Sequence, residues 1–252
     1  MPGPIQSVER AAAILRVIGG AGRPLALAEL AAALDLPRPT VHGLVQTLRA
    51  EGLVDQDRTT AHYRLGGGLR TLASGWDRHD LRASAMNWAD ALAGSTGCAV
   101  YLAVPEGAVA GIVHHVFRPD GSPQTLRTNT EHPLHATAWG KCLLAFAPVS
   151  TPGPRELELR RYTGRTASTV AMLEAHLATA RQRGLATDVG EFEPGAGGAA
   201  VPLRSGGGLT VAALGIAAPT EELFGGGGQP RPALADQLRA AGREISALLA
   251  AR

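Results

Sequence analysis

A stripe of aliphatic side chains between Pro39 and Ala50 constrains the fold of this chain more than any other feature. Its members lie at the spacing i, i+3, i+4 and i+7, which at about 100° per residue places them on one side of a helix. They are Val41, Leu44, Val45 and Leu48. Two shorter helical patterns precede it, over residues 8–18 and 26–34, and Ser7 is the expected N-cap of the first. Residues 35–37 form a turn, so we expect a three-helix bundle that ends in a helix-turn-helix.

The opposite side of the third predicted helix carries polar residues that its core does not require. Such a face fits the major groove of duplex DNA, where glutamine pairs with adenine edges and arginine contacts phosphates. We expect Gln46 to contact a base, Thr40 or Thr47 to reach bases or phosphates, and the two arginines to contact phosphates. The candidate DNA contacts on this helix are Arg38, Thr40, His42, Gln46, Thr47 and Arg49. An ordinary surface helix of a small bundle is the alternative.

Two short segments after this helix favour the DNA-binding interpretation. Residues 53–55 and 62–65 alternate apolar and polar side chains, as two paired strands do. A hairpin that follows a helix-turn-helix is a wing, and its turn contains Arg58 and Thr59. We expect Arg58 to touch the DNA backbone or the minor groove, with Thr59 and Tyr63 as further contacts.

The remaining two thirds of the chain mixes strand and helix patterns, so the predicted fold class is α+β. Leu81, Ala85, Trp88 and Leu92 fall on one face of a helix over residues 76–95, which either links two domains or belongs to the core of the second. Strands are expected over residues 99–104, 109–116, 199–203 and 210–216. Helices are expected over residues 135–146, 172–183 and 233–251.

Bulk composition limits the classes of protein to which the chain can belong. Its formal net charge is only +2, so DNA binding has to depend on a few placed side chains rather than on overall charge. Cys98 and Cys142 form no CxxC pair and have no histidine at metal-binding spacing, so we expect no metal and no cofactor. The start has no signal-peptide pattern, and no apolar segment reaches the ~18 residues of a membrane span. We therefore expect a cytoplasmic protein with no membrane partner.

No catalytic arrangement is evident, so we do not expect an enzyme. His135 and Cys142 lie about 10 Å apart on one predicted helix, too far to form a catalytic group with Asp188. His114 and His115 are neighbours on a predicted strand and point to opposite faces, so they cannot chelate one metal. An enzyme with an accessory winged-helix domain and a winged-helix module that contacts proteins are the alternatives to a DNA-binding regulator.

Several segments resemble the IclR family of bacterial transcription factors. They are IQSVERA at residues 5–11, PTVH at 39–42, LRAEGLV at 48–54, YRLG at 63–66, PLHATAWGK at 133–141 and GEFEPG at 190–195. The resemblance covers nearly the whole chain. It implies a winged helix-turn-helix over residues 1–75, a linker helix over 76–95 and a GAF-like effector-binding domain over 96–252. The family most often has an arginine where this chain has Gly43, which shifts base recognition to Thr40, His42 and Gln46.

The same resemblance implies an effector pocket lined from four places in the second domain. By matching motifs, these places correspond to Ala138, Trp139, Asp188, Gly198, Gly215 and Ala217. Trp139 stands where small residues are usual, so it narrows the cavity, fills it or faces a partner subunit. Gly198, Gly215 and Ala217 replace side chains that often carry a thiol or a hydroxyl, so a ligand finds fewer polar partners than is usual in the family.

We therefore expect a DNA-binding transcriptional regulator, a repressor with activation as the alternative, whose second domain binds a small metabolite. Its partners are double-stranded DNA with a palindromic operator and a second copy of the chain, in a homodimer or tetramer. A narrower resemblance is to family members that respond to glycerol or its phosphate, and it implies glycerol or glycerol 3-phosphate as the effector. The segments that carry it are DLRA at residues 80–83, WAD at 88–90 and IVHHVFRPD at 112–120.

Overall fold

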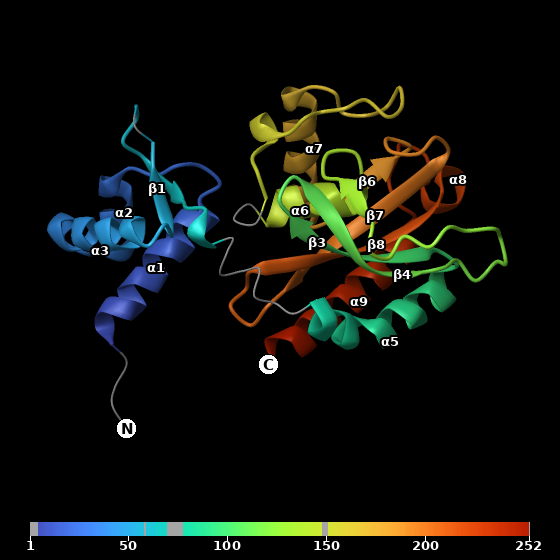
Figure 1. The fold of residues 1–252 in the computed structure, drawn as a ribbon, viewed down its shortest axis with the longest axis horizontal. Helices are drawn as coiled ribbons and strands as arrows, with labels where there is room; N and C mark the ends of the chain where they lie inside the picture. Colours follow the sequence, from blue (N-terminus) through green and yellow to red (C-terminus); the bar gives the residue numbers. More distant parts are fainter. Residues whose placement is uncertain (1–4, 58, 70–77, 148–150, 252) are drawn as a thin grey trace. The chain divides into compact units, whose positions relative to one another are not determined.

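The computed structural model describes residues 5–57, 59–69, 78–147 and 151–251, and the chain divides into two compact units, Met1–Gly75 and Trp76–Arg252. Among its described residues, the first unit has the helices α1 (Gln6–Gly20), α2 (Leu27–Leu34) and α3 (Arg38–Ala50) and a two-stranded antiparallel hairpin (Figure 1). The strands of the hairpin are β1 (Val54–Gln56) and β2 (Tyr63–Leu65). The predicted winged helix-turn-helix and the α+β class are confirmed.

The aliphatic stripe of α3 forms much of the core of the first unit. Val41, Val45 and Leu48 are buried there, and Leu44 is half-buried at the edge of the same cluster. The expectation for Ser7 is wrong. Helix α1 begins at Gln6 with Ile5 as its N-cap, so Ser7 lies inside the first turn rather than before it.

The second unit is built on a sheet of six strands in the order β5-β4-β3-β8-β7-β6, and each strand is antiparallel to its neighbours. The strands are β3 (Ala99–Glu106), β4 (Val109–Val116), β5 (Glu131–Pro133), β6 (Ala186–Val189), β7 (Ala196–Arg204) and β8 (Thr210–Pro219). The sequence patterns predicted β3, β4, β7 and β8 but missed the short edge strands β5 and β6.

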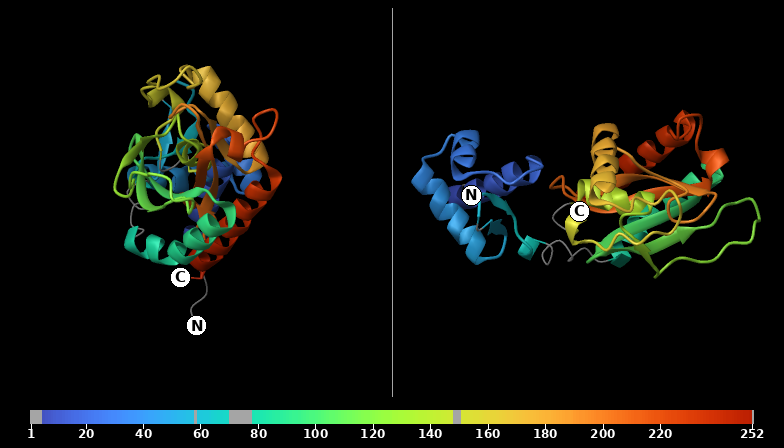
Figure 2. Two further views of the ribbon diagram at one scale, coloured as in Figure 1. Left: turned by 90° about the vertical axis from the view of Figure 1, so that its right-hand side faces the viewer. Right: turned by 90° about the horizontal axis from the view of Figure 1, so that it is seen from above.

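Helices cover both faces of this sheet (Figures 1 and 2). The longer pair lies side by side on one face, and the other pair covers the opposite face. The first pair is α5 (Arg78–Thr96) and α9 (Pro232–Ala250), and the second is α6 (Ala138–Phe146) and α7 (Val170–Arg183). A short 3-10 helix, η1 (Pro154–Glu156), and one helical turn, α8 (Thr220–Leu223), complete the described elements. Each face of the sheet therefore has its own hydrophobic core.

Helix α5 packs against the sheet and α9 as part of the core of the second unit, which was the alternative to a linker. Leu81, Ala85 and Leu92 are buried as expected, but Trp88 is 37% exposed and its assignment to the buried face is wrong. Ala89 takes that place, since it lies four residues after Ala85 and its small side chain allows close packing. A linking role for this helix stays a prediction.

Candidate functional site

The turn between α2 and α3 sets the position of the outer face of α3. Asp35 ends α2 in the left-handed conformation, with φ of 51°, which aspartate tolerates better than most residues. Pro37 is the N-cap of α3 and Pro39 lies in its first turn, where a missing N–H costs no helical hydrogen bond. The aliphatic stripe then fixes the rotation of α3, so that its polar side is turned toward solvent.

Three polar side chains form a chain of contacts along this outer face. Gln46 Nε2 lies 3.3 Å from His42 Nε2, and Arg49 Nη1 donates to Gln46 Oε1 at 3.1 Å. The spacing of four and three residues places these side chains one above the other on the helix. All six candidate contacts on α3 are exposed or half-buried. The geometry therefore presents a polar helix surface with an amide near its centre.

The hairpin beside α3 has an ordered turn. Asp57 Oδ1 accepts hydrogen bonds from the backbone N–H groups of Thr60 and Thr59, both at 2.8 Å, and these bonds lower the pKa of Asp57. Thr59 is exposed, whereas Arg58 lies outside the described residues. The prediction for Tyr63 is wrong. It is 3% exposed and pairs with Leu25, because the alternation of β2 turns this side chain into the core.

The strand register of the second unit brings the candidate effector residues together on the face of the sheet covered by α6. Asp188, Gly198 and Ala217 lie opposite one another on β6, β7 and β8. Gly215 lies two residues before Ala217 and therefore faces the same side. Ala138 and Trp139 lie on helix α6, which packs over these strand residues. All are buried except Ala217, which is half-buried.

Trp139 fills the space over two of the glycines. A Cβ atom on Gly215 would lie 2.9 Å from Trp139 Cε3, and one on Gly198 would lie 3.1 Å from the Cβ of Ala138 and 3.5 Å from Trp139 Cζ3. Trp139 is 5% exposed in the described structure. The large residue on α6 and the glycines on β7 and β8 are therefore complementary in shape.

A cluster of aromatic rings, which the sequence patterns did not predict, surrounds Trp139. Tyr101 stacks on both Trp139 and His115, with ring centroids 4.3 Å and 4.5 Å apart. His132 lies 5.4 Å from the indole and 5.3 Å from the ring of Phe192. Burial lowers the pKa of His115 and His132 to about 4 and raises that of Tyr101 to about 12, so all three are uncharged at neutral pH.

Three buried ring nitrogens in this cluster have no hydrogen-bond partner among the described residues. They are His115 Nε2, His132 Nδ1 and Trp139 Nε1. Buried polar atoms are normally satisfied, so these atoms point to a missing partner. The cluster can therefore offer neutral hydrogen-bonding groups and aromatic faces to a small molecule.

Asp188 stands beside this cluster as a buried carboxyl group. Its Oδ1 accepts a hydrogen bond from the Glu191 N–H at 2.7 Å, and only 6% of the residue is exposed. Burial raises the pKa of Asp188 to about 7, against the opposing influence of Lys141. Asp188 is thus the candidate effector residue whose charge changes near neutral pH.

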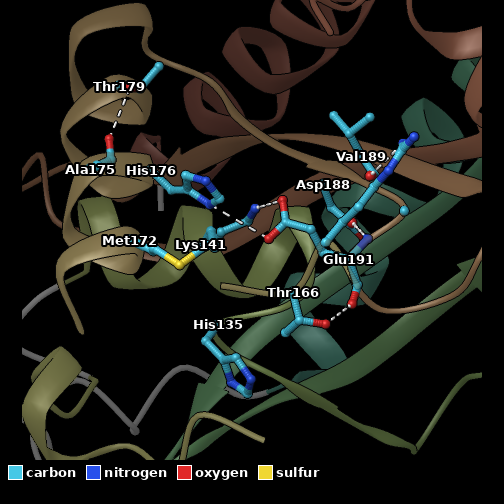
Figure 3. A network of polar contacts seen from close by, with 12 residues as sticks. His135, Lys141, Thr166, Met172, Ala175, His176, Thr179, Asp188, Val189 and Glu191 are labelled. Atoms are coloured by element: carbon cyan, nitrogen blue, oxygen red, sulfur yellow. Dashed lines mark hydrogen bonds and ion pairs between the residues drawn. The ribbon is translucent and has the colours of Figure 1, made fainter. Parts of the chain in front are cut away.

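A buried ion pair connects α6 to the segment between β6 and β7 (Figure 3). Lys141 Nζ lies 2.5 Å from Glu191 Oε1, and the two side chains are 2% and 7% exposed. His176 of α7 approaches the same carboxylate, with its Nδ1 3.6 Å from Oε2. Burial acts to raise the pKa of Glu191, but His176 and Lys141 outweigh it and hold the pKa below its usual value. Glu191 therefore stays ionised, and its contacts tie the three elements together.

No hydrogen bond joins His135, Cys142 and Asp188 in the described part of the chain. His135 Nε2 donates to the Arg160 carbonyl at 2.8 Å, and Cys142 is fully buried, which raises the pKa of its thiol. His114 and His115 pair with successive residues of β3 and so face opposite sides of the sheet, as expected. In the described ranges no three His, Cys, Asp or Glu residues could hold a metal ion. Nor is any helix there long and apolar enough to cross a membrane.

Comparison with known proteins gives matches over nearly the whole chain. The model of the IclR helix-turn-helix domain matches residues 7–58, and that of the bacterial transcriptional regulator IclR C-terminal domain matches residues 74–247. The glycerol operon regulatory protein of Streptomyces griseus is 43% identical over 220 residues, or 87% of each chain. That of Streptomyces coelicolor is 41% identical over 243 residues, covering 96% of this chain and 95% of the relative.

A solved structure shows the same fold. The IclR homologue from Microbacterium hydrocarbonoxydans, crystallised with 4-hydroxybenzoate, superimposes with a TM-score of 0.59. The alignment covers 98% of this chain and 100% of that chain, at 24% identity. At this identity the likeness concerns the fold alone.

Proposed function

The chain belongs to the IclR family of bacterial transcriptional regulators, and from that premise we propose that it represses genes for glycerol use and releases their operator when it binds glycerol or glycerol 3-phosphate. The two Streptomyces relatives, whose names refer to the glycerol operon, support this specific role. The observation that carries the DNA-binding part is the polar outer face of α3, with Gln46 held between His42 and Arg49 beside a wing.

In the proposed complex, α3 lies in the major groove. Gln46 contacts a base edge, Thr40 and His42 contribute to recognition, and Arg38 and Arg49 bind phosphates. Thr59 brings the wing to the DNA backbone. Two copies of the chain place two such helices on a palindromic operator, in a homodimer or a tetramer.

The effector is proposed to bind on the α6 side of the sheet. The residues assigned to this pocket are Ala138, Trp139, Asp188, Gly198, Gly215 and Ala217. The unpartnered ring nitrogens beside Trp139 support this location, because hydroxyl groups of a polyol can satisfy them. A coupling free energy of about 1–3 kcal/mol between effector and operator changes operator affinity roughly 5–150-fold.

We also propose that the chain has no catalytic activity of its own. Two findings support this. The relatives are named regulatory proteins, and no hydrogen bond joins His135, Cys142 and Asp188 in the described structure, where His135 contacts Arg160 and Asp188 contacts Glu191. An enzyme with an accessory winged helix and a protein-binding winged helix are therefore the less favoured alternatives.

A gel-shift titration tests this proposal. DNA from upstream of the chain's own gene and of neighbouring glycerol genes is titrated with the protein at moderate salt, with and without glycerol or glycerol 3-phosphate. We expect specific binding that one of the two compounds weakens. Asp188→Ala is expected to retain operator affinity and to change the response to the compound. Absence of specific binding to either DNA contradicts the proposed function, and an unaltered response removes Asp188 from the pocket.

A further inference from the structure

A second hollow in the effector unit lies between α7 and β6, the end strand of the sheet. Its volume is about 380 Å³, and none of the six proposed effector residues lines it. It is large enough for a metabolite of a few heavy atoms with its hydration water. The hollow is therefore a candidate small-molecule site that is separate from the proposed effector pocket at Trp139.

The charged residues around this hollow are mostly cationic. Lys141, Arg165 and Arg183 line it together with His176, and Glu191 is the single acidic residue among the lining residues. Lys141 is already neutralised by Glu191. Neither Arg165 nor Arg183 forms an ion pair with any carboxylate in the described part of the chain. The two exposed arginines leave an excess of positive charge that an anion can balance.

The inner wall of the hollow favours a ligand that donates a hydrogen bond, because of Glu191. Glu191 is 5% exposed, and its Oε2 has no hydrogen-bond partner among the described residues. His176 Nδ1 lies 3.6 Å from this oxygen, just beyond hydrogen-bond distance. A buried carboxylate oxygen without a donor is costly, so a bound molecule that brings a hydroxyl group to this position is favoured. In Figure 3, dashed lines join this carboxylate to Lys141 and to His176.

We propose that the hollow binds a small hydroxylated anion, such as a polyol phosphate or a hydroxy acid. Its anionic group contacts Arg165 and Arg183, and one of its hydroxyl groups donates to Glu191 Oε2. The ligand then bridges α7 and the segment that follows β6, the strand that carries Asp188. This second site does not depend on the proposed operator or on the identity of the effector.

Isothermal titration calorimetry of the full chain without DNA, with four small molecules, distinguishes the need for an anionic group from the need for hydroxyl groups. Glycerol 3-phosphate and glycerate carry both an anionic group and hydroxyl groups, inorganic phosphate carries only the anion, and glycerol carries only hydroxyl groups. We expect the first two to bind more tightly than inorganic phosphate. Because DNA is absent, failure of the operator proposal does not affect the outcome.

Two variants assign the binding to this hollow. The double variant Arg165→Gln/Arg183→Gln is expected to bind glycerate, which is not a proposed effector of the Trp139 pocket, at least about tenfold more weakly, since removal of one charge-assisted hydrogen bond lowers affinity by about tenfold or more. Arg155→Gln is the control, because Arg155 is exposed on η1 and does not line the hollow. Glycerol binding, which the proposed function places near Trp139, is expected to be the same in all three proteins.

Two results would overturn the proposal. One is equal affinity of the double variant and the wild-type protein for glycerate. The other is absence of binding of both hydroxylated anions to the wild-type protein at millimolar concentration. Equal affinity for inorganic phosphate and glycerol 3-phosphate would remove the assigned role of Glu191, because the hydroxyl groups would then add nothing.

Discussion

At the scale of single residues, Gln46 is the side chain on which sequence recognition is expected to depend most. Its amide is held by His42 and Arg49, so its orientation is set before DNA binds. We predict that Gln46→Ala lowers the preference for one base step by roughly 1–3 kcal/mol. Competition gel shifts with operators altered one base at a time measure this loss.

Arg38→Gln is the matched contrast for Gln46→Ala. Arg38 is exposed at the start of α3 and is assigned to a phosphate, so its loss should weaken binding about equally on every sequence and reduce the salt dependence of binding. A uniform loss for Gln46→Ala as well would show that its amide does not enter the groove.

Asp188 gives the stability of the protein a pH dependence. Its pKa is about 7 in the folded protein and near 3.8 in the unfolded chain, so the folded state binds this proton more tightly. The contribution to stability is therefore complete below about pH 4, is lost as the pH rises toward 7, and stays lost above it. The loss is on the order of a few kcal/mol.

Asp188→Asn tests this dependence, since the amide oxygen can still accept the Glu191 N–H while the group no longer ionises. We predict that the difference in free energy of unfolding between variant and wild type grows between pH 4 and pH 7. Urea unfolding at several pH values measures it. A constant difference over this range would show that the folded-state pKa is not raised.

At the scale of helices and strands, α3 contains a glycine that its packing does not require. A Cβ on Gly43 meets no atom within 4 Å, so Gly43→Ala is expected to stabilise the first unit by about 1 kcal/mol through helix propensity. Thermal unfolding measures the change. Gly242→Ala in α9 is the opposite control. Its Cβ would lie 2.6 Å from Val201 Cγ2, so this substitution is expected to destabilise the second unit. A lower Tm for Gly43→Ala would contradict the prediction.

The packing of α6 on β8 predicts a strong coupling between Trp139 and Gly215. Gly215→Ala alone is expected to cost about 1–3 kcal/mol by overpacking, and Trp139→Ala alone about 3–5 kcal/mol because the indole is buried. In the Trp139→Ala background the cost of Gly215→Ala should fall close to zero, which a double-mutant cycle in urea measures. Additive costs would show that the indole is not what confines Gly215.

Elements with a long local repeat could be predicted from the sequence, whereas short strands and contacts between distant residues could not. Val41, Val45 and Leu48 repeat over two helical turns, so α3 was recognisable without tertiary information. Strands β5 and β6 have three and four residues, too few for alternation to stand out. The stack of Tyr101 on His115 depends on the register of β3 and β4, and Lys141 is 50 residues from Glu191. Such contacts arise from topology, which local periodicity does not contain.

At the scale of the whole molecule, the proposed binding of two copies to one operator requires their α3 helices to lie on the same side of the DNA. We predict that insertion of about five base pairs between the half-sites, half a helical turn, abolishes cooperative binding, and that an insertion of about ten restores most of it. Gel shifts with a spacer series measure this periodicity. Binding that is indifferent to spacing would show that each copy binds its half-site independently.

If the effector binds in the proposed pocket, the indole of Trp139 affects the metabolite concentration at which the protein responds. A metabolite that settles against Gly215 has to displace this ring first. The apparent dissociation constant of the metabolite then equals the intrinsic constant divided by the fraction of molecules in which the ring has already moved away from Gly215. The Trp139 side chain thus competes with the metabolite for the same space and sets the metabolite concentration needed for a response. Substitutions that weaken its stacking on Tyr101 would therefore lower this concentration without altering any atom that touches the metabolite.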